Sequence, residues 1–229
     1  DTRTALLVCI RNEDPSLLGR NLAEMLGALS AVPEARQLHL FLLSDSDQPP
    51  VAAAAAAVAA SLAQRFGASV PVTYRRRERN TGFKAGNLRD FCDRWGGDFD
   101  FAVVLDADSV MSPGTILRLV RVMQAEPRLG IVQTLVVGLP SISPFARVFQ
   151  FGMRLGMRSY TLGSAWWQGD CGPYWGHNAI LRLAPFIEHC ALPALPGRGP
   201  LSGCVLSHDQ LEAVLMRRAG YQVRVLPLE

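Results

Sequence analysis

Largely apolar runs alternate with helix-like segments in the first half of this sequence, and this alternation constrains the fold more than any other feature. The runs occupy residues 4–10, 38–43 and 101–105. Such runs are typical of strands in a parallel sheet that is covered on both faces. The segments between them carry apolar residues at helical spacing. The pattern therefore predicts an α/β, Rossmann-like fold with a mostly parallel central sheet flanked by helices.

Helix and strand signals continue along the chain. Asp14 and Pro15 suit the N-cap and first position of a helix whose apolar stripe runs from Leu18 to Leu29. The other elements that we expect are a helix after Pro50, a strand at 70–74, a helix at 84–95, a helix from Pro113, a strand at 130–137, a helix from Ser207 to Arg218 and a strand at 221–226.

Length and composition favour one domain over residues 1–229, because 49% of the residues are hydrophobic and no long linker divides the chain. A net charge of +3 gives no reason to expect a nucleic-acid partner. The longest apolar stretch, 51–63, is too short to span a bilayer, so we expect a soluble domain. The chain begins inside a strand signal, which indicates a domain excised from a longer protein.

Acidic and amide side chains follow three of the predicted strands. They are Asn12 and Glu13 after the first, Asp45 and Asp47 after the second, and Asp106 and Asp108 after the fourth. In open α/β sheets, ligands bind beyond the carboxyl ends of the strands. Carboxylates gathered there repel one another unless a cation neutralises them, so the pattern indicates a divalent metal.

The most informative of these loops is Asp106-Ala-Asp108, directly after a fully apolar strand. Residues two apart on an extended segment project to one side, so both carboxylates can face one ligand. Their oxygens suit Mg²⁺ or Mn²⁺ bridging a diphosphate. Asp108 as a simple cap of the next helix is the alternative for an isolated DxD. The apolar strand before it favours the metal site.

Two other segments each have a functional and a purely structural interpretation. The basic turn from Arg75 to Asn87 offers backbone N–H groups and Lys84 to a phosphate, or is a solvated loop. Ser207-His208-Asp209 begins a helix, where Asp209 serves either as a helix-terminal acid or as the base that deprotonates an acceptor hydroxyl.

Several segments, in order, resemble glycosyltransferase family 2 with the GT-A fold, and the resemblance covers nearly the whole chain. Within that family it is greatest to the membrane-bound glucosyltransferases of osmoregulated periplasmic glucan synthesis. The segments are Leu43-Ser-Asp45, Asn80-Thr-Gly-Phe-Lys-Ala-Gly-Asn87, Leu105-Asp-Ala-Asp-Ser109, Ile131-Val-Gln-Thr134, Tyr174-Trp-Gly-His-Asn178, His189 to Gly197 and Leu206-Ser-His-Asp209, followed by Leu215 to Gly220.

The resemblance implies a role for each matching residue. Asp45 would lie near uridine, Lys84 on the diphosphate, Asp108 on the metal, and Asp209 would be the catalytic base. The nucleotide-sugar site would also include Asn12, Glu13, Asn87 and Asp106. The donor and acceptor path would include Gln133, Thr134, Trp175, Gly176, His177, Asn178 and His208.

The resemblance also implies the reaction. It is an inverting, processive transfer of glucose from UDP-glucose to a growing β-glucan with Mg²⁺ or Mn²⁺, and the product is a β-1,2-linked periplasmic glucan. The implied partners are the UDP-sugar, the glucan acceptor, the membrane through transmembrane segments outside this chain, and an acyl carrier protein. The implied location is the cytoplasmic face of the bacterial inner membrane.

One departure and three alternatives accompany this hypothesis. Processive members carry a downstream Gln-x-x-Arg-Trp signature that this sequence lacks, which leaves the acceptor site and the activity of the chain by itself in question. The alternatives are a cellulose-synthase-like enzyme of another linkage, a non-catalytic nucleotide-sugar sensor, and a haloacid-dehalogenase-type phosphatase whose first DxD aspartate is a nucleophile.

An amphipathic segment at 145–160 has two interpretations. Phe145 and Tyr160 belong to one apolar helical face, and three arginines lie elsewhere around the helix. The face could lie at a membrane interface or pack into a core. The following Trp166 and Trp167 could stack on sugar rings or lie in a core or interface.

Overall fold

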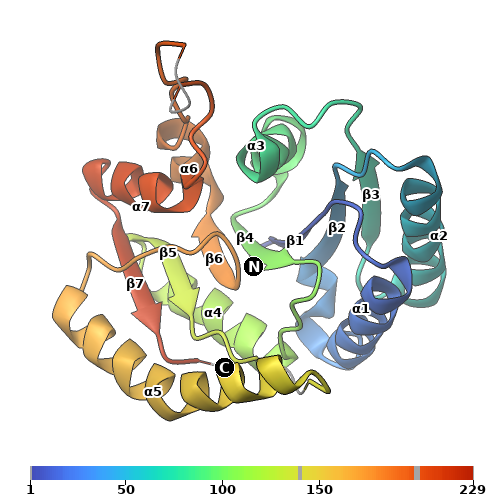
Figure 1. The fold of residues 1–229 in the computed structure, drawn as a ribbon, viewed down its shortest axis with the longest axis horizontal. Helices are drawn as coiled ribbons and strands as arrows, with labels where there is room; N and C mark the ends of the chain where they lie inside the picture. The colour runs from blue at the N-terminus through green and yellow to red at the C-terminus, as the bar shows by residue number, and fades with distance from the viewer. Residues whose placement is uncertain (1, 139–140, 199–201, 229) are drawn as a thin grey trace.

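The computed structural model describes residues 2–138, 141–198 and 202–228, and it contains a central seven-stranded sheet flanked by helices (Figure 1). The strand order is β3-β2-β1-β4-β6-β5-β7. The strands are β1 (Thr4–Ile10), β2 (Leu38–Ser44), β3 (Val72–Arg76), β4 (Phe101–Asp106), β5 (Leu129–Thr134), β6 (Ala179–Arg182) and β7 (Gln222–Leu226). The helices are α1 (Pro15–Leu29), α2 (Pro49–Phe66), α3 (Phe83–Trp95), α4 (Pro113–Ala125), α5 (Pro144–Gln168), α6 (Leu183–His189) and α7 (His208–Arg218).

The predicted mostly parallel sheet is confirmed, with one antiparallel strand that the sequence did not reveal. β1, β2, β3 and β4 pair in parallel, as do β5 and β7. β6 lies between β4 and β5 and runs antiparallel to both. Its four residues are too few to show a clear periodicity. The expected strand at 130–137 ends instead at Thr134, where pairing with β7 stops.

Two apolar layers fix the helices against the sheet. The side chains of one face pack against α1, α2 and α4, and those of the other face pack against α3, α6 and α7. Alternate residues of the central strands contribute to each layer, as Leu6 and Leu7 of β1 illustrate. Burial on both sides explains why these strands are continuous apolar runs in the sequence.

Arg182 secures the junction between the two halves of the sheet. It lies on β6, paired with Phe101 of β4, and its guanidinium carbon lies 5.1 Å from the centroid of that ring. Its Nε donates to the Leu129 carbonyl at 2.8 Å, and its Nη2 donates to the Met123 carbonyl at 2.6 Å. One side chain therefore ties β6 to both the end of α4 and the start of β5.

α5 is longer than expected and lies along the edge of the domain beside β7, remote from α3 (Figure 1). Its 25 residues include both Trp166 and Trp167, which are 83% and 81% exposed, so neither belongs to the core. Among the described residues of α5, only Thr161 is buried. The apolar face at 145–160 is likewise exposed, so packing into the core of this domain is the wrong interpretation for it. Among the described helices, none has the length and apolar character needed to cross a membrane.

Candidate active site

A cavity of about 250 Å³ opens at the carboxyl ends of β1, β2 and β4. The structure brings five of the predicted nucleotide-sugar residues to its lining, which are Glu13, Asp45, Lys84, Asn87 and Asp106. They come from the loops after β1 and β2, the first turns of α3 and the end of β4, and the sheet order brings these segments together. The position matches the strand-end rule for ligands of open α/β sheets.

Lys84 and Asp106 form the charged centre of this cavity. The Lys84 ammonium donates to Oδ1 of Asp106. Nδ1 of His177 lies 3.8 Å from the other carboxylate oxygen, Oδ2, and is buried without a hydrogen-bond partner in the described part of the chain. A cation, a carboxylate and an imidazole thus meet at one position of the strand-end cavity.

The carboxylate of Asp45 is held by Arg77. Nε of Arg77 donates to Oδ1 at 2.7 Å, and Nη2 donates to Oδ2 at 2.6 Å. The same guanidinium donates to the backbone carbonyls of Thr81 and Phe83 at 2.9 and 3.0 Å. Planar paired bonds of this kind are among the stronger side-chain contacts. Asp45 therefore fixes the loop that leads into α3 and carries Lys84.

Arg75 and Asn87 form a buried polar pair beneath that loop. Nη2 of Arg75 donates to Oδ1 of Asn87 at 2.7 Å, and the amide of Asn87 donates to the Leu43 carbonyl at 2.9 Å. Nε of Arg75 lies 3.0 Å from the Asp90 carboxylate. Burial lowers the pKa of Arg75, and the nearby Asp90 opposes this shift. The basic turn is therefore not a purely solvated loop, because Arg75 and Arg77 are both engaged in the fold.

Asn12 lies beside the cavity in a left-handed conformation, with φ of 61°. Its amide donates to Asp47 at 2.6 Å, and its backbone N–H donates to Ser46 at 3.0 Å. The Asn12 hydrogen bond is the main cause of the lowered pKa of Asp47. Asn12 thus joins the ends of β1 and β2 at the rim of the cavity.

Asp108 lies in the turn after β4, and its side chain is exposed. It does not cap the next helix, because Ser112 is the N-cap of α4 and accepts from the Thr115 N–H. Among the described residues, no group of three or more histidine, cysteine or acidic side chains surrounds a metal position. An exposed carboxylate with open positions nonetheless fits a divalent ion whose remaining ligands come from a substrate diphosphate.

The second side of the site is built from α7 and the loop 175–178. Gly176 has φ of +78°, and a Cβ added there would lie 3.4 Å from Cβ and 3.7 Å from Oδ2 of Asp209, and 3.7 Å from Cε1 of His208. Oδ1 of Asp209 accepts from the Gln210 N–H at 2.9 Å and from Ser207 at 3.2 Å. The other oxygen, Oδ2, is the one that faces the loop.

Gln133 and Thr134 lie at the end of β5 and are almost completely buried. The amide nitrogen of Gln133 donates to the His177 carbonyl at 2.9 Å, and its oxygen accepts from the Trp175 N–H at 2.9 Å. The Thr134 hydroxyl donates to the Asn178 carbonyl at 2.6 Å. These two residues therefore hold the loop 175–178 in place, and their influence on a ligand would pass through that loop.

Two buried residues next to the site were not among the predicted site residues. Glu212 is 3% exposed and its Oε2 lies 3.0 Å from Nδ1 of His208, four residues earlier on α7. Burial raises the pKa of Glu212, and the His208 contact partly offsets this. Tyr174 is fully buried, with no partner for its hydroxyl in the described structure. Burial raises its pKa well above the ordinary value. The i, i+4 spacing of His208 and Glu212 was a local signal for Glu212, and Tyr174 was visible only as part of a motif.

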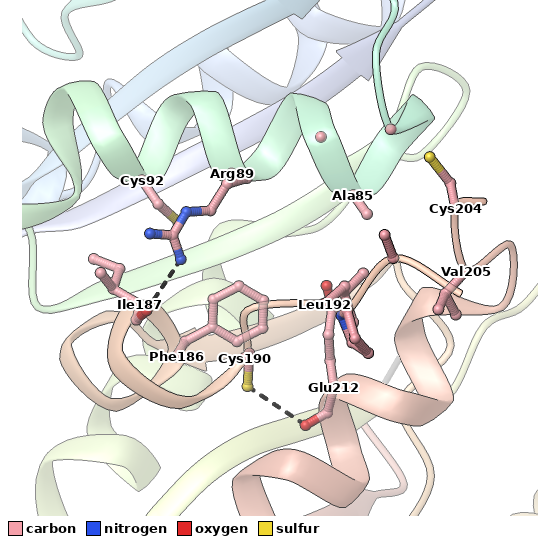
Figure 2. A pocket seen from close by; sticks show the side chains of 14 residues that line it. Ala85, Arg89, Cys92, Phe186, Ile187, Cys190, Leu192, Cys204, Val205 and Glu212 are labelled. Atoms are coloured by element: carbon pink, nitrogen blue, oxygen red, sulfur yellow. Dashed lines mark hydrogen bonds between the residues drawn. The ribbon is translucent and has the colours of Figure 1, made fainter. Parts of the chain in front are cut away.

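A second, largely apolar pocket of about 220 Å³ lies on the other side of the first turns of α3 (Figure 2). Ala85 and Arg89 of α3 face Phe186 of α6 and Glu212 of α7 across it. Arg89 donates to the Ile187 carbonyl at 3.1 Å, which joins α3 to α6. Glu212 thus lies between the apolar pocket and His208. This places the buried carboxylate behind the N-terminal end of α7.

Comparison with solved structures shows the fold. A mannosyltransferase from Pyrobaculum calidifontis, solved with GDP-Man and Mn²⁺, matches with a TM-score of 0.66 and 16% identity over 99% of this chain and 55% of that chain. The Staphylococcus aureus TarS fragment 1–349, solved with UDP, matches with a TM-score of 0.59 and 11% identity over 99% of this chain and 58% of that chain. The fold is therefore the GT-A fold.

Comparison with curated proteins shows similarity over nearly the whole chain. Glucans biosynthesis glucosyltransferase H of Pseudomonas paraeruginosa is 43% identical over 223 residues, which are 97% of this chain and 26% of that protein. The Dickeya dadantii protein of the same name is 43% identical over 221 residues, which are 96% of this chain and 26% of that protein. The chain thus spans about a quarter of the length of these relatives. The family model for "Glycosyl transferase family 2" matches residues 6–190. This match excludes the phosphatase alternative. The chain therefore belongs to glycosyl transferase family 2.

Proposed function

We propose that this chain is the catalytic domain of an inverting, processive glucosyltransferase that transfers glucose from UDP-glucose to a growing β-1,2-glucan. The observation that carries the proposal is the cavity at the strand ends, whose lining gathers Lys84, Asp45 and Asp106. The names of the relatives support glucan synthesis as the process. The UDP in the TarS structure and the nucleotide sugar in the mannosyltransferase structure support a nucleotide-sugar donor.

The donor would bind in this cavity with its diphosphate near Lys84. Asp106 already directs the Lys84 ammonium toward the cavity. Binding of the donor would therefore cost little conformational entropy at the Lys84 side chain. Asp45 would act near the uridine and would also hold the loop through Arg77. Asn12, Glu13 and Asn87 complete the proposed nucleotide-sugar site.

Asp108 would hold a Mg²⁺ or Mn²⁺ ion together with the donor diphosphate. The bound ion would stabilise the negative charge of the UDP leaving group. The exposed position of Asp108 after β4 supports this role, because its carboxylate is not used by a helix cap. The Mn²⁺ in the mannosyltransferase structure supports a divalent metal in this fold.

Asp209 would be the general base. Its Oδ2 would take the proton of the acceptor hydroxyl while the hydroxyl oxygen forms a bond to the anomeric carbon. The bond from that carbon to the diphosphate oxygen breaks on the opposite side, so the configuration inverts and UDP leaves. The loop 175–178, held by Gln133 and Thr134, would position the acceptor next to Oδ2. His208 would lie beside the same path.

The wider setting of the reaction is part of the proposal. In the longer protein, transmembrane segments outside this chain would anchor the domain at the cytoplasmic face of the inner membrane and deliver the glucan to the periplasm. Neither the site nor the relatives support an acyl carrier protein as a partner. Linkage analysis of the product separates the β-1,2-glucan from the product of a cellulose-synthase-like enzyme.

Calorimetric titration with UDP and UDP-glucose, with and without Mn²⁺ or Mg²⁺, tests the proposed donor site. We expect metal-dependent binding to the wild-type chain and its loss in Asp108→Ala. Asp98→Ala is the matched control, because Asp98 is an exposed acid at the other end of β4. A folded wild-type chain that binds neither ligand under any metal condition would contradict the proposal. Full physiological function of an Asp209→Asn variant would instead favour a nucleotide-sugar sensor.

A further inference from the structure

The outer face of α5 carries a continuous set of large apolar side chains without a partner in the described structure. Phe145 at its start is 80% exposed, and Trp166 and Trp167 at its end are more than 80% exposed. The other exposed apolar residues of the helix are Val148, Phe149, Phe151, Met153, Leu155, Tyr160 and Leu162. Monomeric proteins rarely expose a contiguous apolar surface of this extent, so the face marks an interaction surface.

Helical geometry separates this face from the side that contacts the domain. At 3.6 residues per turn, the exposed apolar side chains occupy an arc of about 200°. Thr161, the buried residue of α5, lies on the opposite side of the helix. The helix is about 37 Å long at 1.5 Å per residue. It therefore presents a long apolar surface that mostly points away from the sheet and whose edge, at Phe149 and Met153, reaches a pocket beside the domain.

Charge on α5 is of one sign and lies in one strip. Arg147, Arg154 and Arg158 are exposed and fall within about 40° of one another, at one border of the apolar arc. The segment from 141 to 169 contains no acidic residue. Nη2 of Arg154 also donates to the Gly138 carbonyl at 3.0 Å, whereas Arg147 and Arg158 form no side-chain bond to the described residues. A cationic strip of this kind complements an anionic surface.

We propose that α5 is an interfacial helix that binds this domain directly to an anionic lipid bilayer. Three arginines within 25 residues prevent it from spanning the hydrocarbon core, and its wide apolar arc with a basic border suits a helix that lies in the plane of the interface. Tryptophan and tyrosine side chains are favoured at that depth. The inference rests on α5 alone and does not depend on the proposed reaction.

The orientation of the bound domain follows from a pocket beside α5. Phe149, Met153 and Met157 line an apolar pocket of about 410 Å³ together with Trp175 and His177. The apolar surface of α5 therefore continues to the loop 175–178 of the candidate site. A bilayer on the outer face of α5 would lie close to the mouth of this pocket.

Vesicle flotation of the 229-residue chain tests the proposal. We expect the chain to float with vesicles of phosphatidylcholine mixed with phosphatidylglycerol, and to float weakly with phosphatidylcholine alone. Replacing Arg147 and Arg158 with glutamine should lower the partition coefficient about fivefold for each arginine. Added salt should have the same effect in the wild type, because it screens the attraction.

The apolar contribution is tested by Trp166→Ser with Trp167→Ser. We expect the partition coefficient of this variant to be at least about tenfold lower, because two large apolar side chains no longer insert into the bilayer. Tryptophan fluorescence of the wild type should be quenched by brominated lipids, and the variant should lose most of this quenching. These side chains are exposed, so circular dichroism and Tm should remain those of the wild type.

Matched controls lie outside α5. Arg36→Gln with Arg118→Gln removes two exposed arginines elsewhere, and Leu206→Ser removes an apolar side chain that is 78% exposed. Neither should change flotation. The proposal is overturned by absence of flotation with anionic vesicles, by flotation that the α5 variants leave unchanged, or by α5-dependent dimerisation without lipid binding in sedimentation equilibrium.

Discussion

The guanidinium of Arg77 holds both carboxylate oxygens of Asp45, with Nε at 2.7 Å from Oδ1 and Nη2 at 2.6 Å from Oδ2. Both side chains are at most 10% exposed. Arg77 also binds two carbonyls of the turn before α3, so the end of β2 and the loop carrying Lys84 are one connected unit. The shape of the donor cavity therefore depends on this pair.

Arg77→Lys should destabilise the chain by about 1–2 kcal/mol, because an ammonium keeps the charge but loses the paired planar bonds. It should also weaken UDP-glucose binding, since Lys84 follows the same loop. Urea unfolding and calorimetry measure the two effects. Arg79→Lys is the control, because Arg79 is an exposed arginine of the same turn. Equal stability of Arg77→Lys and the wild type would show that the charge alone suffices.

Asp209→Asn should abolish glucosyl transfer while leaving UDP-glucose binding intact. The amide oxygen of asparagine can still accept the hydrogen bonds from Ser207 and the Gln210 N–H, but the amide cannot take a proton. Loss of a general base lowers the rate at least about 100-fold. Release of UDP in the presence of acceptor measures the rate, and calorimetry measures binding. Asp98→Asn, an exposed acid far from α7, should retain the wild-type rate. An active Asp209→Asn variant would remove Asp209 from the mechanism.

Gly176→Ala should lower transfer more than about tenfold, because the added Cβ would contact Asp209 and His208 at 3.4–3.7 Å. It should also cost about 1 kcal/mol of stability, since φ is +78°. Gly169→Ala separates the two effects. Gly169 has φ of +52° but nothing within 4 Å of an added Cβ, so that variant should lose stability and keep its rate. Equal rates for both variants would contradict the close approach of the loop to Asp209.

Glu212→Gln should stabilise the chain more at pH 8 than at pH 5. Burial raises the pKa of Glu212 above its ordinary value, so the folded state favours the protonated acid. In the wild type, the stabilisation by the protonated Glu212 is fully present below the unfolded-state pKa and is lost as the pH rises through the folded-state pKa. Glutamine remains neutral at both pH values, so the variant does not lose this stabilisation. The loss in the wild type amounts to about 1.4 kcal/mol of unfolding free energy per unit of pKa shift. Urea unfolding of both proteins at the two pH values checks the sign, with Glu188→Gln as the exposed control.

The sequence revealed those elements whose signal lies within the element itself. β1, β2 and β4 are recognisable because burial on both faces makes each strand apolar throughout. β6 and α6 were missed because the first has four residues and the second has seven. Such short elements are stabilised by pairing with distant strands, as when Val104 pairs with Ala179, and that pairing leaves no local pattern.

The site could be predicted in part for the same reason. Carboxylates after apolar strands and the helix start at His208-Asp209 are visible in the sequence, and five of the predicted nucleotide-sugar residues line one cavity. The partner of Asp45 was not visible, because Arg77 is one of several neighbouring arginines and only the fold selects it. Tyr174 appeared as part of a motif, but its complete burial depends on three-dimensional packing.

The junction at Arg182 lies between two parts of the sheet that are each continuous in sequence. β1 to β4 and α1 to α4 come from residues 4–125 and line the strand-end cavity, whereas residues 129–226 supply Asp209 and the loop 175–178. The sheet joins the two halves only where β4 pairs with β6. The β4–β6 pairing therefore sets how far Asp209 lies from Lys84, and Arg182 influences the candidate site without lining its cavity.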